Sequence, residues 1–167
     1  MVQKLISFLS YKLIWLSGVW GSTIGIAFLT PIFTAIYVYW TIQRITKKRL
    51  FLTYLTCIAI IGMISESMVL NNTAYQFLPA RLFIPYWLMA IWIAFPCVCA
   101  TSLKQAIKSP IVAICIGAIF GPLAYQGAAS IGSIELINGP QGLGTLSVVW
   151  GTMMFMIHRW IKILPDH

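Results

Sequence analysis

Residues 44–70 read RITKKR followed by LFLTYLTCIAIIGMISESMVL, so a basic cluster is followed by an apolar run that holds one charged residue, Glu66. A helix that crosses a membrane needs about 20 consecutive, mostly apolar residues. The run from 50 to 70 has that length. The stretch therefore predicts a membrane-spanning helix that begins at the basic cluster.

The same alternation of apolar runs and basic clusters continues along the whole chain. Its 167 residues are 60% hydrophobic and 8% charged, whereas a soluble domain carries about 25% charged residues. The sequence predicts an all-α integral membrane protein, a six-transmembrane-helix bundle that forms a single domain over 1–167. The expected spans are about 3–20, 23–46, 50–70, 82–103, 110–131 and 145–162, with a loop at 139–144.

The N-terminal segment leaves five helices as an alternative to six. Gly18, Gly21 and Gly25 lie close together in the middle of the first apolar stretch. Such a cluster favours a turn, after which Ser22 or Thr23 could cap a second helix. The alternative is that Gly21-x-x-x-Gly25 is a packing motif inside one continuous span.

The distribution of positive charge favours six spans. Nine of the eleven basic residues fall in four clusters, which are Lys4, then Arg44 with Lys47, Lys48 and Arg49, then Lys104 with Lys108, then Arg159 with Lys162. With six spans, all four clusters lie on one side of the membrane and Arg81 on the other, as the positive-inside rule requires when both the N- and C-termini are cytoplasmic. The cost is Lys12, which lies partway along the first helix and must snorkel or pair.

Charge and cysteine usage exclude several classes of protein. The net charge is +8, but the basic residues mark the ends of apolar segments and form no basic face. We therefore expect contact with anionic headgroups and no nucleic acid. The cysteines all lie inside apolar runs, at Cys57, Cys97, Cys99 and Cys115. No cysteine–histidine grouping accompanies them, so we expect no disulfide, no metal and no cofactor.

Polar residues are expected to gather in the outer half of the membrane. Glu66 lies about 25 Å of helix beyond Arg49, and an ionisable group within a span is a candidate for function. The predicted ligand-binding residues are Glu66, Ser67, Arg81, Trp92, Tyr125, Gln126 and Glu135. The loop residues of the same layer are Asn71, Asn72, Tyr75 and Gln76. Arg81 is the expected partner of Glu66 or Glu135. The alternative is that these groups only satisfy one another and hold loops together.

The apolar segment 110–131 combines small residues with a proline. Small residues at a spacing of four let helices approach closely, and a proline inside a helix removes one backbone hydrogen bond. The predicted packing and kink positions are Gly117, Gly121, Pro122, Gly127 and Gly132. Packing accounts for the pattern, but a helix bent around a cavity, with Tyr125 and Gln126 pointing inward, fits it as well.

Several motifs together resemble one known family. They are Tyr11-x-x-x-Trp15, Gly62-x-x-x-Glu66-Ser67, Trp87-x4-Trp92-x2-Phe95, Ser102-Leu103, and Gly121-Pro122-Leu123-Ala124-Tyr125-x-Gly127-Ala128 with Gly132 and Glu135. Over nearly the whole chain the sequence is similar to an uncharacterised multi-pass family of the bacterial inner membrane, catalogued only as a domain of unknown function (two-eight-seven-eight).

Two departures from that family affect what the resemblance implies. The family tends to have Asp at Glu66, and an Asn-His pair at Ala100-Thr101, so chemistry carried by that pair would be lost here. Genes of the family are often found near enzymes that modify membrane fatty acids. The resemblance therefore implies a bacterial cytoplasmic (inner) membrane protein with a role in lipid modification or envelope stress.

Three functional hypotheses follow. The first is a non-catalytic protein that binds or moves a small amphipathic molecule or lipid through an outward-facing pocket around Glu66. The second is a substrate-binding subunit similar in fold to those of energy-coupling-factor vitamin transporters. The third is a membrane-embedded enzyme acting on lipid chains, with Glu66 as general acid/base. The expected partners are the bilayer, an amphipathic ligand, and a membrane partner subunit or a second copy of the chain.

Overall fold

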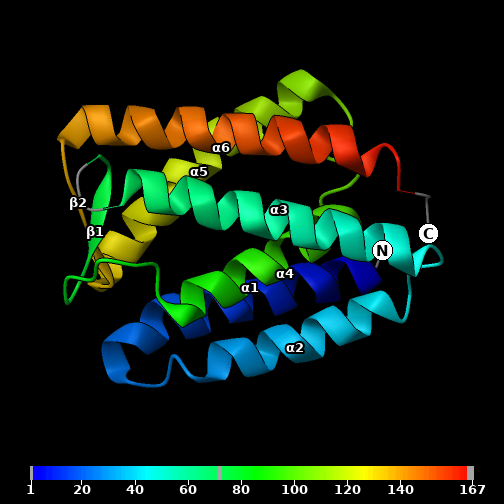
Figure 1. Cartoon of the computed structure of the whole chain (residues 1–167), viewed down its shortest axis with the longest axis horizontal. Helices are drawn as coiled ribbons and strands as arrows, with labels where there is room; N and C mark the ends of the chain where they lie inside the picture. Colours follow the sequence, from blue (N-terminus) through cyan, green and yellow to red (C-terminus); the bar gives the residue numbers. More distant parts are fainter. Residues whose placement is uncertain (1, 71–72, 165–167) are drawn as a thin grey trace.

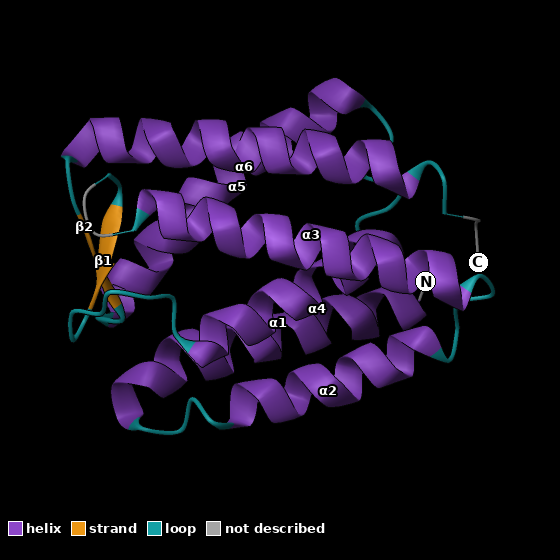
Figure 2. Ribbon diagram, viewed as in Figure 1, coloured by secondary structure: helices purple, strands orange, loops and turns teal. Residues whose placement is uncertain are grey.

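The computed structural model describes residues 2–70 and 73–164, which form six helices and two short strands (Figures 1 and 2). The elements in chain order are α1 (Val2–Ile24), α2 (Leu29–Ile42), α3 (Lys48–Val69), β1 (Tyr75–Phe77), α4 (Tyr86–Thr101), α5 (Pro110–Ile131), β2 (Ile134–Leu136) and α6 (Gly139–Ile161). The prediction of a six-helix, predominantly α-helical chain is confirmed.

Helix α4 lies at the centre of the bundle. Its sequence, YWLMAIWIAFPCVCAT, is apolar on every side, and such a helix is stable where other helices or lipid keep it from water. It packs against α1, α2 and α3, and more lightly against α6. Helices α5 and α6 form the most extensive helix pair and run side by side (Figure 1). Helix α5 also contacts α1.

Glycines allow close approach at two helix contacts. A Cβ at Gly121 would lie 2.3 Å from Cγ of Trp150 on α6, and a Cβ at Gly117 would lie 2.2 Å from the Trp150 carbonyl oxygen. A Cβ at Gly62 on α3 would lie 2.1 Å from Cε3 of Trp92 on α4. These positions have no room for a methyl group, so glycine sets the distance between the helices.

The other predicted packing positions have different roles. Gly127 has only Trp15 within contact range, and Gly132 ends α5 with a positive φ of 85°. Glycine is suited to that left-handed position. Pro122 lies inside α5, which stays helical through it. Because proline has no N–H, Pro122 cannot donate a hydrogen bond to the carbonyl of Ala118.

A two-stranded antiparallel ribbon closes one end of the bundle. It pairs Tyr75 with Leu136, Gln76 with Glu135 and Phe77 with Ile134. Side chains alternate between the two faces of a strand, so Tyr75 and Phe77 are buried while Gln76 is not. The ribbon joins the α3–α4 connection to the α5–α6 connection. An all-α prediction misses it because each strand has only three residues.

Several element boundaries differ from those predicted by four to six residues, and two of these differences have a clear local cause. Residues 139–144, expected to be a loop, form the first turns of α6. Pro140 suits the first turn of a helix, and Gly142 lies against the Ile137 carbonyl and the Ala74 backbone, where a side chain would not fit. The turn between the first two helices is real but comes later than expected, after α1 ends at Ile24. Gly25 has a positive φ of 82° there.

The basic clusters gather at the end of the bundle opposite the ribbon. The start of α1, the α2–α3 turn and the end of α6 lie at that end (Figure 1). The Ser102 hydroxyl donates to the Lys4 carbonyl at 2.6 Å, and the Lys104 ammonium donates to the Leu164 carbonyl at 3.0 Å. Arg81 lies in the loop between β1 and α4, at the ribbon end. The structure thus separates Arg81 from the four clusters.

By length and composition, α3 and α5 are the two described helices that could cross a membrane. Helices α2 and α4 are apolar but shorter, with 14 and 16 residues. Together these helices are weak support for membrane association.

Candidate functional site

Glu66 is the centre of a buried polar cluster built from four elements. Glu66 lies on α3, and the residue is only 2% exposed. Tyr75 of β1 donates to Oε2 at 2.6 Å, Trp92 of α4 donates from Nε1 to Oε1 at 3.1 Å, and the Tyr125 hydroxyl of α5 also donates to Oε1. Burial of a carboxylate is costly unless donors replace the lost water. Three donors do so here.

Local sequence explains why these side chains meet. Gly62 lies one turn before Glu66 and lets the Trp92 ring lie flat against α3. The alternation of β1 turns Tyr75 inward, where its ring centroid is 5.0 Å from that of Tyr125. Burial, and then the neighbouring Glu66 carboxyl, raise the pKa of the Tyr75 hydroxyl. Tyr75 therefore keeps its proton and remains a hydrogen-bond donor.

A cavity of about 570 Å³ adjoins this cluster. Such a volume lies in the range of pockets that hold small organic ligands. Its walls come from α1, α3, α4, α5, α6 and the ribbon, and most of the lining side chains are aromatic or aliphatic. Four of the seven tryptophans of the chain line it, namely Trp15, Trp87, Trp92 and Trp150. The rings of Trp92 and Trp150 stack with their centroids 5.0 Å apart.

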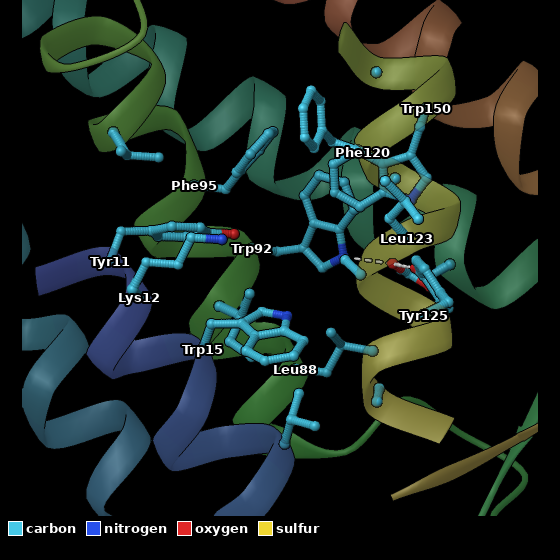
Figure 3. Close-up of a pocket in the computed structure, with 18 of the residues that line it drawn as sticks. Tyr11, Lys12, Trp15, Leu88, Trp92, Phe95, Phe120, Leu123, Tyr125 and Trp150 are labelled. Carbon is cyan, nitrogen blue, oxygen red and sulfur yellow. Dashed lines mark hydrogen bonds between the residues drawn. The ribbon is translucent and has the colours of Figure 1, made fainter. Parts of the chain in front are cut away.

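The cavity lies between α1 and α5 (Figure 3). Tyr11, Lys12 and Trp15 approach from one side, and Phe120, Leu123 and Tyr125 from the other, with Trp92 and Leu88 of α4 between them. The lining residues nearest the outside are the exposed ones, which are Phe8 and Lys12 on α1 and Phe120 and Leu123 on α5. Glu66, Tyr75 and Trp92 are buried. The cavity thus opens sideways, between two helices.

Lys12 is the cation at this opening. Its side chain is exposed, and its Nζ lies 5.5 Å from the centroid of the Phe8 ring. Glu66, the acidic residue of the cavity lining, accepts hydrogen bonds from three neutral side chains. The cavity thus combines a carbon-rich interior with one positive charge at its mouth.

The structure brings together three of the seven residues predicted to bind a ligand: Glu66, Trp92 and Tyr125 line the cavity. Ser67 and Gln126 do not. The Ser67 hydroxyl donates to the backbone of its own helix at 2.9 Å, and its side chain is exposed. Gln126 is exposed as well, because it follows Tyr125 directly and a helix turns about 100° per residue.

Arg81 and Glu135 also lie outside the cavity lining. Arg81 was predicted to pair with Glu66 or Glu135, and the hydrogen bonds described for Glu66 come instead from neutral side chains. Glu135 is on the exposed face of β2 and accepts a hydrogen bond from Gln76 Nε2 at 2.6 Å. Of the loop residues, Tyr75 joins the cluster, while Asn71 and Asn72 lie outside the described residues.

Sequence reasoning missed the contribution of α1 to the cavity. Tyr11 and Trp15, four residues apart, share one face of that helix and both line the cavity. Their spacing is visible in the sequence, but their partner α5 is remote along the chain. Lys12 was expected only to snorkel or pair, and its place at the cavity opening could not be read from its own helix.

Comparisons with known proteins identify one match. The family model described as "Protein of unknown function (DUF2878)" matches residues 4–156. Neither the curated proteins nor the solved structures contain a match. The matched region holds most of α1, all of α2 to α5 with the ribbon, and most of α6, and with them every lining residue of the cavity. The chain therefore belongs to this family of proteins of unknown function.

Proposed function

We propose that this chain is a multi-pass membrane protein that binds a small amphipathic molecule or lipid in the cavity between α1 and α5. The observation that carries the proposal is the 570 Å³ cavity, which is walled by aromatic rings and opens between two helices at exposed apolar residues. Ligand sites are typically concave, largely apolar and furnished with few polar groups. The Glu66 cluster fixes the positions of three of the rings that form the wall.

The exterior of the bundle supports a location in a bilayer. On α1, Leu5, Leu9 and Leu13 are 58%, 56% and 53% exposed, and their spacing of four places them on one outer stripe. On α5, Ile111 and Phe120 are 71% and 63% exposed. Soluble monomers rarely expose large contiguous apolar surface. Lipid chains would cover these stripes, and an opening between them would face lipid.

The distribution of charge supports an orientation. Four basic clusters at one end and Arg81 at the other follow the pattern of a protein whose basic end faces the cytoplasm. In this proposal six helices cross the membrane, both termini are cytoplasmic and the β1–β2 ribbon faces outward. The membrane is the bacterial inner membrane that the family resemblance implies. The Glu66 cluster, next to the ribbon, then belongs to the outer half.

The proposal is tested by filling the cavity. Ala124 on α5 lines the cavity, and Ala124→Phe would occupy part of its volume. Ile119→Phe is the matched control, since Ile119 lies on the same helix, is 56% exposed and is not a lining residue. Each protein is purified in detergent, and the small molecules extracted from it are identified by mass spectrometry.

We expect the unaltered chain and Ile119→Phe to retain the same molecule, and Ala124→Phe to retain at least about tenfold less, which corresponds to about 1.4 kcal/mol of binding free energy. Size-exclusion chromatography and circular dichroism check that both variants are folded. Retention of the same molecules in the same amounts by all three proteins would contradict the proposal.

A further inference from the structure

Lys12 has no counterion among residues 2–70 and 73–164, although it lies within α1 and faces the cavity opening. An ammonium group part-way along a membrane helix is costly unless an anion or water reaches it. The neighbouring Phe8 ring offers only a weak cation–π contact at 5.5 Å. The Glu66 carboxyl group does not act as the counterion of Lys12, because three side-chain donors already surround it.

The interior of the cavity presents mainly carbon, together with the hydroxyl group of Tyr11. Tyr75, Trp92 and Tyr125 all direct their polar atoms at Glu66, so the cavity is left with their ring carbons. Phe77, Trp87 and Trp150 add further aromatic surface. Lys12 and Tyr125 lie on opposite sides of the cavity (Figure 3). The positive charge of Lys12 is therefore on one side of the cavity, and the Glu66 cluster is on the other.

We propose that the occupant of the cavity is an anionic single-chain amphiphile, whose carboxylate or phosphate binds Lys12 at the opening and whose apolar chain lies against the aromatic wall. This inference rests on the proposed function and narrows the class of ligand. The volume of about 570 Å³ suits one chain better than the two chains of a diacyl lipid. Such a molecule would reach the cavity from the bilayer, between Phe8 of α1 and Phe120 of α5.

The test uses the tryptophans of the cavity as reporters. Bromine atoms quench tryptophan fluorescence on contact, and four of the seven tryptophans line the cavity. The full chain in a neutral detergent is titrated with three probes of one chain length: dibromostearic acid, dibromostearyl phosphate and dibromostearyl alcohol. Titrations at about pH 9 keep the carboxyl group ionised, and the alcohol serves as the uncharged reference.

We expect the acid or the phosphate to bind roughly tenfold more tightly than the alcohol, as one charge-assisted contact provides. The Lys12→Met variant should lose that preference and Lys12→Arg should keep it. Lys4→Met is the matched control, because Lys4 is exposed on the same helix but is not a lining residue. It should bind as the unaltered chain does. Whichever anion shows the larger dependence on Lys12 identifies the headgroup chemistry.

Equal affinity for the two anionic probes and the alcohol would overturn the inference. So would an equal loss of preference in Lys4→Met and Lys12→Met, because general attraction to a basic protein would then explain it. If all three probes quench equally and Ala124→Phe abolishes quenching by all of them, the cavity binds amphiphiles without selecting anions. The proposed function would then stand and this inference would fail.

Discussion

Glu66 connects four elements of the fold through one carboxyl group. It belongs to α3, and its donors come from β1, α4 and α5. Each donor is also part of the aromatic wall of the cavity, so the hydrogen bonds determine the positions of the rings. A change at this residue therefore acts on both the stability and the shape of the cavity.

Replacing Glu66 by Ala should lower the free energy of unfolding by about 2–4 kcal/mol. The substitution leaves three buried donors without an acceptor, each worth about 1–3 kcal/mol in water-soluble proteins and on average about 0.6 kcal/mol between membrane helices. Glu66→Gln should cost about half as much, because the amide keeps one acceptor oxygen and its N–H can donate to a tyrosine hydroxyl.

Unfolding in mixed micelles with increasing sodium dodecyl sulfate, followed by tryptophan fluorescence, measures these differences. Glu135→Gln is the control, since that exposed carboxylate bonds only Gln76 among the described side chains, and it should change stability by less than about 0.5 kcal/mol. A Glu66→Ala variant as stable as Glu135→Gln would contradict the role given to the cluster.

The importance of Glu66 can be predicted from the sequence, because a lone acid in a long apolar run must find compensation. The identity of its partners is harder to predict. Arg81 was the expected partner by charge, but tyrosine hydroxyls and an indole N–H are also strong donors, and they can approach through an apolar interior without a second buried charge. Ser67 was expected in the site because it flanks Glu66, and Gln126 because it lies at a similar depth in the membrane. Depth and adjacency do not decide which way a side chain points, since neighbouring residues on a helix point in different directions.

At the scale of elements, tryptophans on α4 and α6 fit against glycines on α3 and α5. The Trp150 side chain lies where a Cβ at Gly121 would be, and the Trp92 ring lies where a Cβ at Gly62 would be. The same two tryptophans stack on each other and line the cavity. Close helix contact and the shape of the cavity therefore depend on the same residues.

Gly121→Ala should destabilise the protein by about 1–3 kcal/mol, the usual cost of overpacking a filled site, because the new methyl group would lie 2.3 Å from Trp150. Gly144→Ala, in the first turns of α6, is the matched control. Its Cβ would meet nothing within 4 Å, and alanine is the better helix former by about 1 kcal/mol.

Thermal unfolding in detergent, monitored by circular dichroism, distinguishes the two variants. The melting temperature should fall for Gly121→Ala and stay the same or rise for Gly144→Ala. If both variants melt at the same temperature as the unaltered chain, α5 and α6 are not held at the distance that Gly121 sets.

The helices could be predicted to within a few residues from apolar run length, and Pro110 does begin α5 as expected. The sequence does not predict which face of each helix points inward. Helices α4 and α5 are apolar on every side, so their sequences carry little information on how each helix is rotated. The start of α6 was missed because three glycines in 139–144 favour a loop locally. Tertiary packing of Gly142 against the Ala74 backbone overrides that preference.

At the scale of the whole molecule, the positive charges at one end and the ribbon at the other define an axis. The proposed orientation predicts that these ends lie on opposite sides of the membrane. Leu82 lies in the loop between β1 and α4 and is 83% exposed. Thr46 lies in the α2–α3 turn and is also exposed. The two positions are suitable for labelling from one side.

In intact cells, a membrane-impermeant maleimide should label Leu82→Cys and should label Thr46→Cys only after the membrane is permeabilised. The unaltered chain gives the background, since its own four cysteines lie within helices. Labelling of Thr46→Cys from outside, with protection of Leu82→Cys, would show the reverse orientation. Labelling of both from outside would contradict the six-span arrangement.

Helix α4 has 16 residues, or about 24 Å of length, which is shorter than the roughly 30 Å hydrocarbon core of a bilayer. Its neighbours enclose most of it, so in a bilayer α4 would be insulated from lipid. Hydrophobic mismatch would then fall on the outer helices, which accommodate a thicker or thinner membrane by tilting. Tilt of α1 against α5 changes the width of the gap between them while Trp92 stays in place. Membrane thickness would thus change the opening of the cavity, whereas the shape of the cavity interior would stay the same.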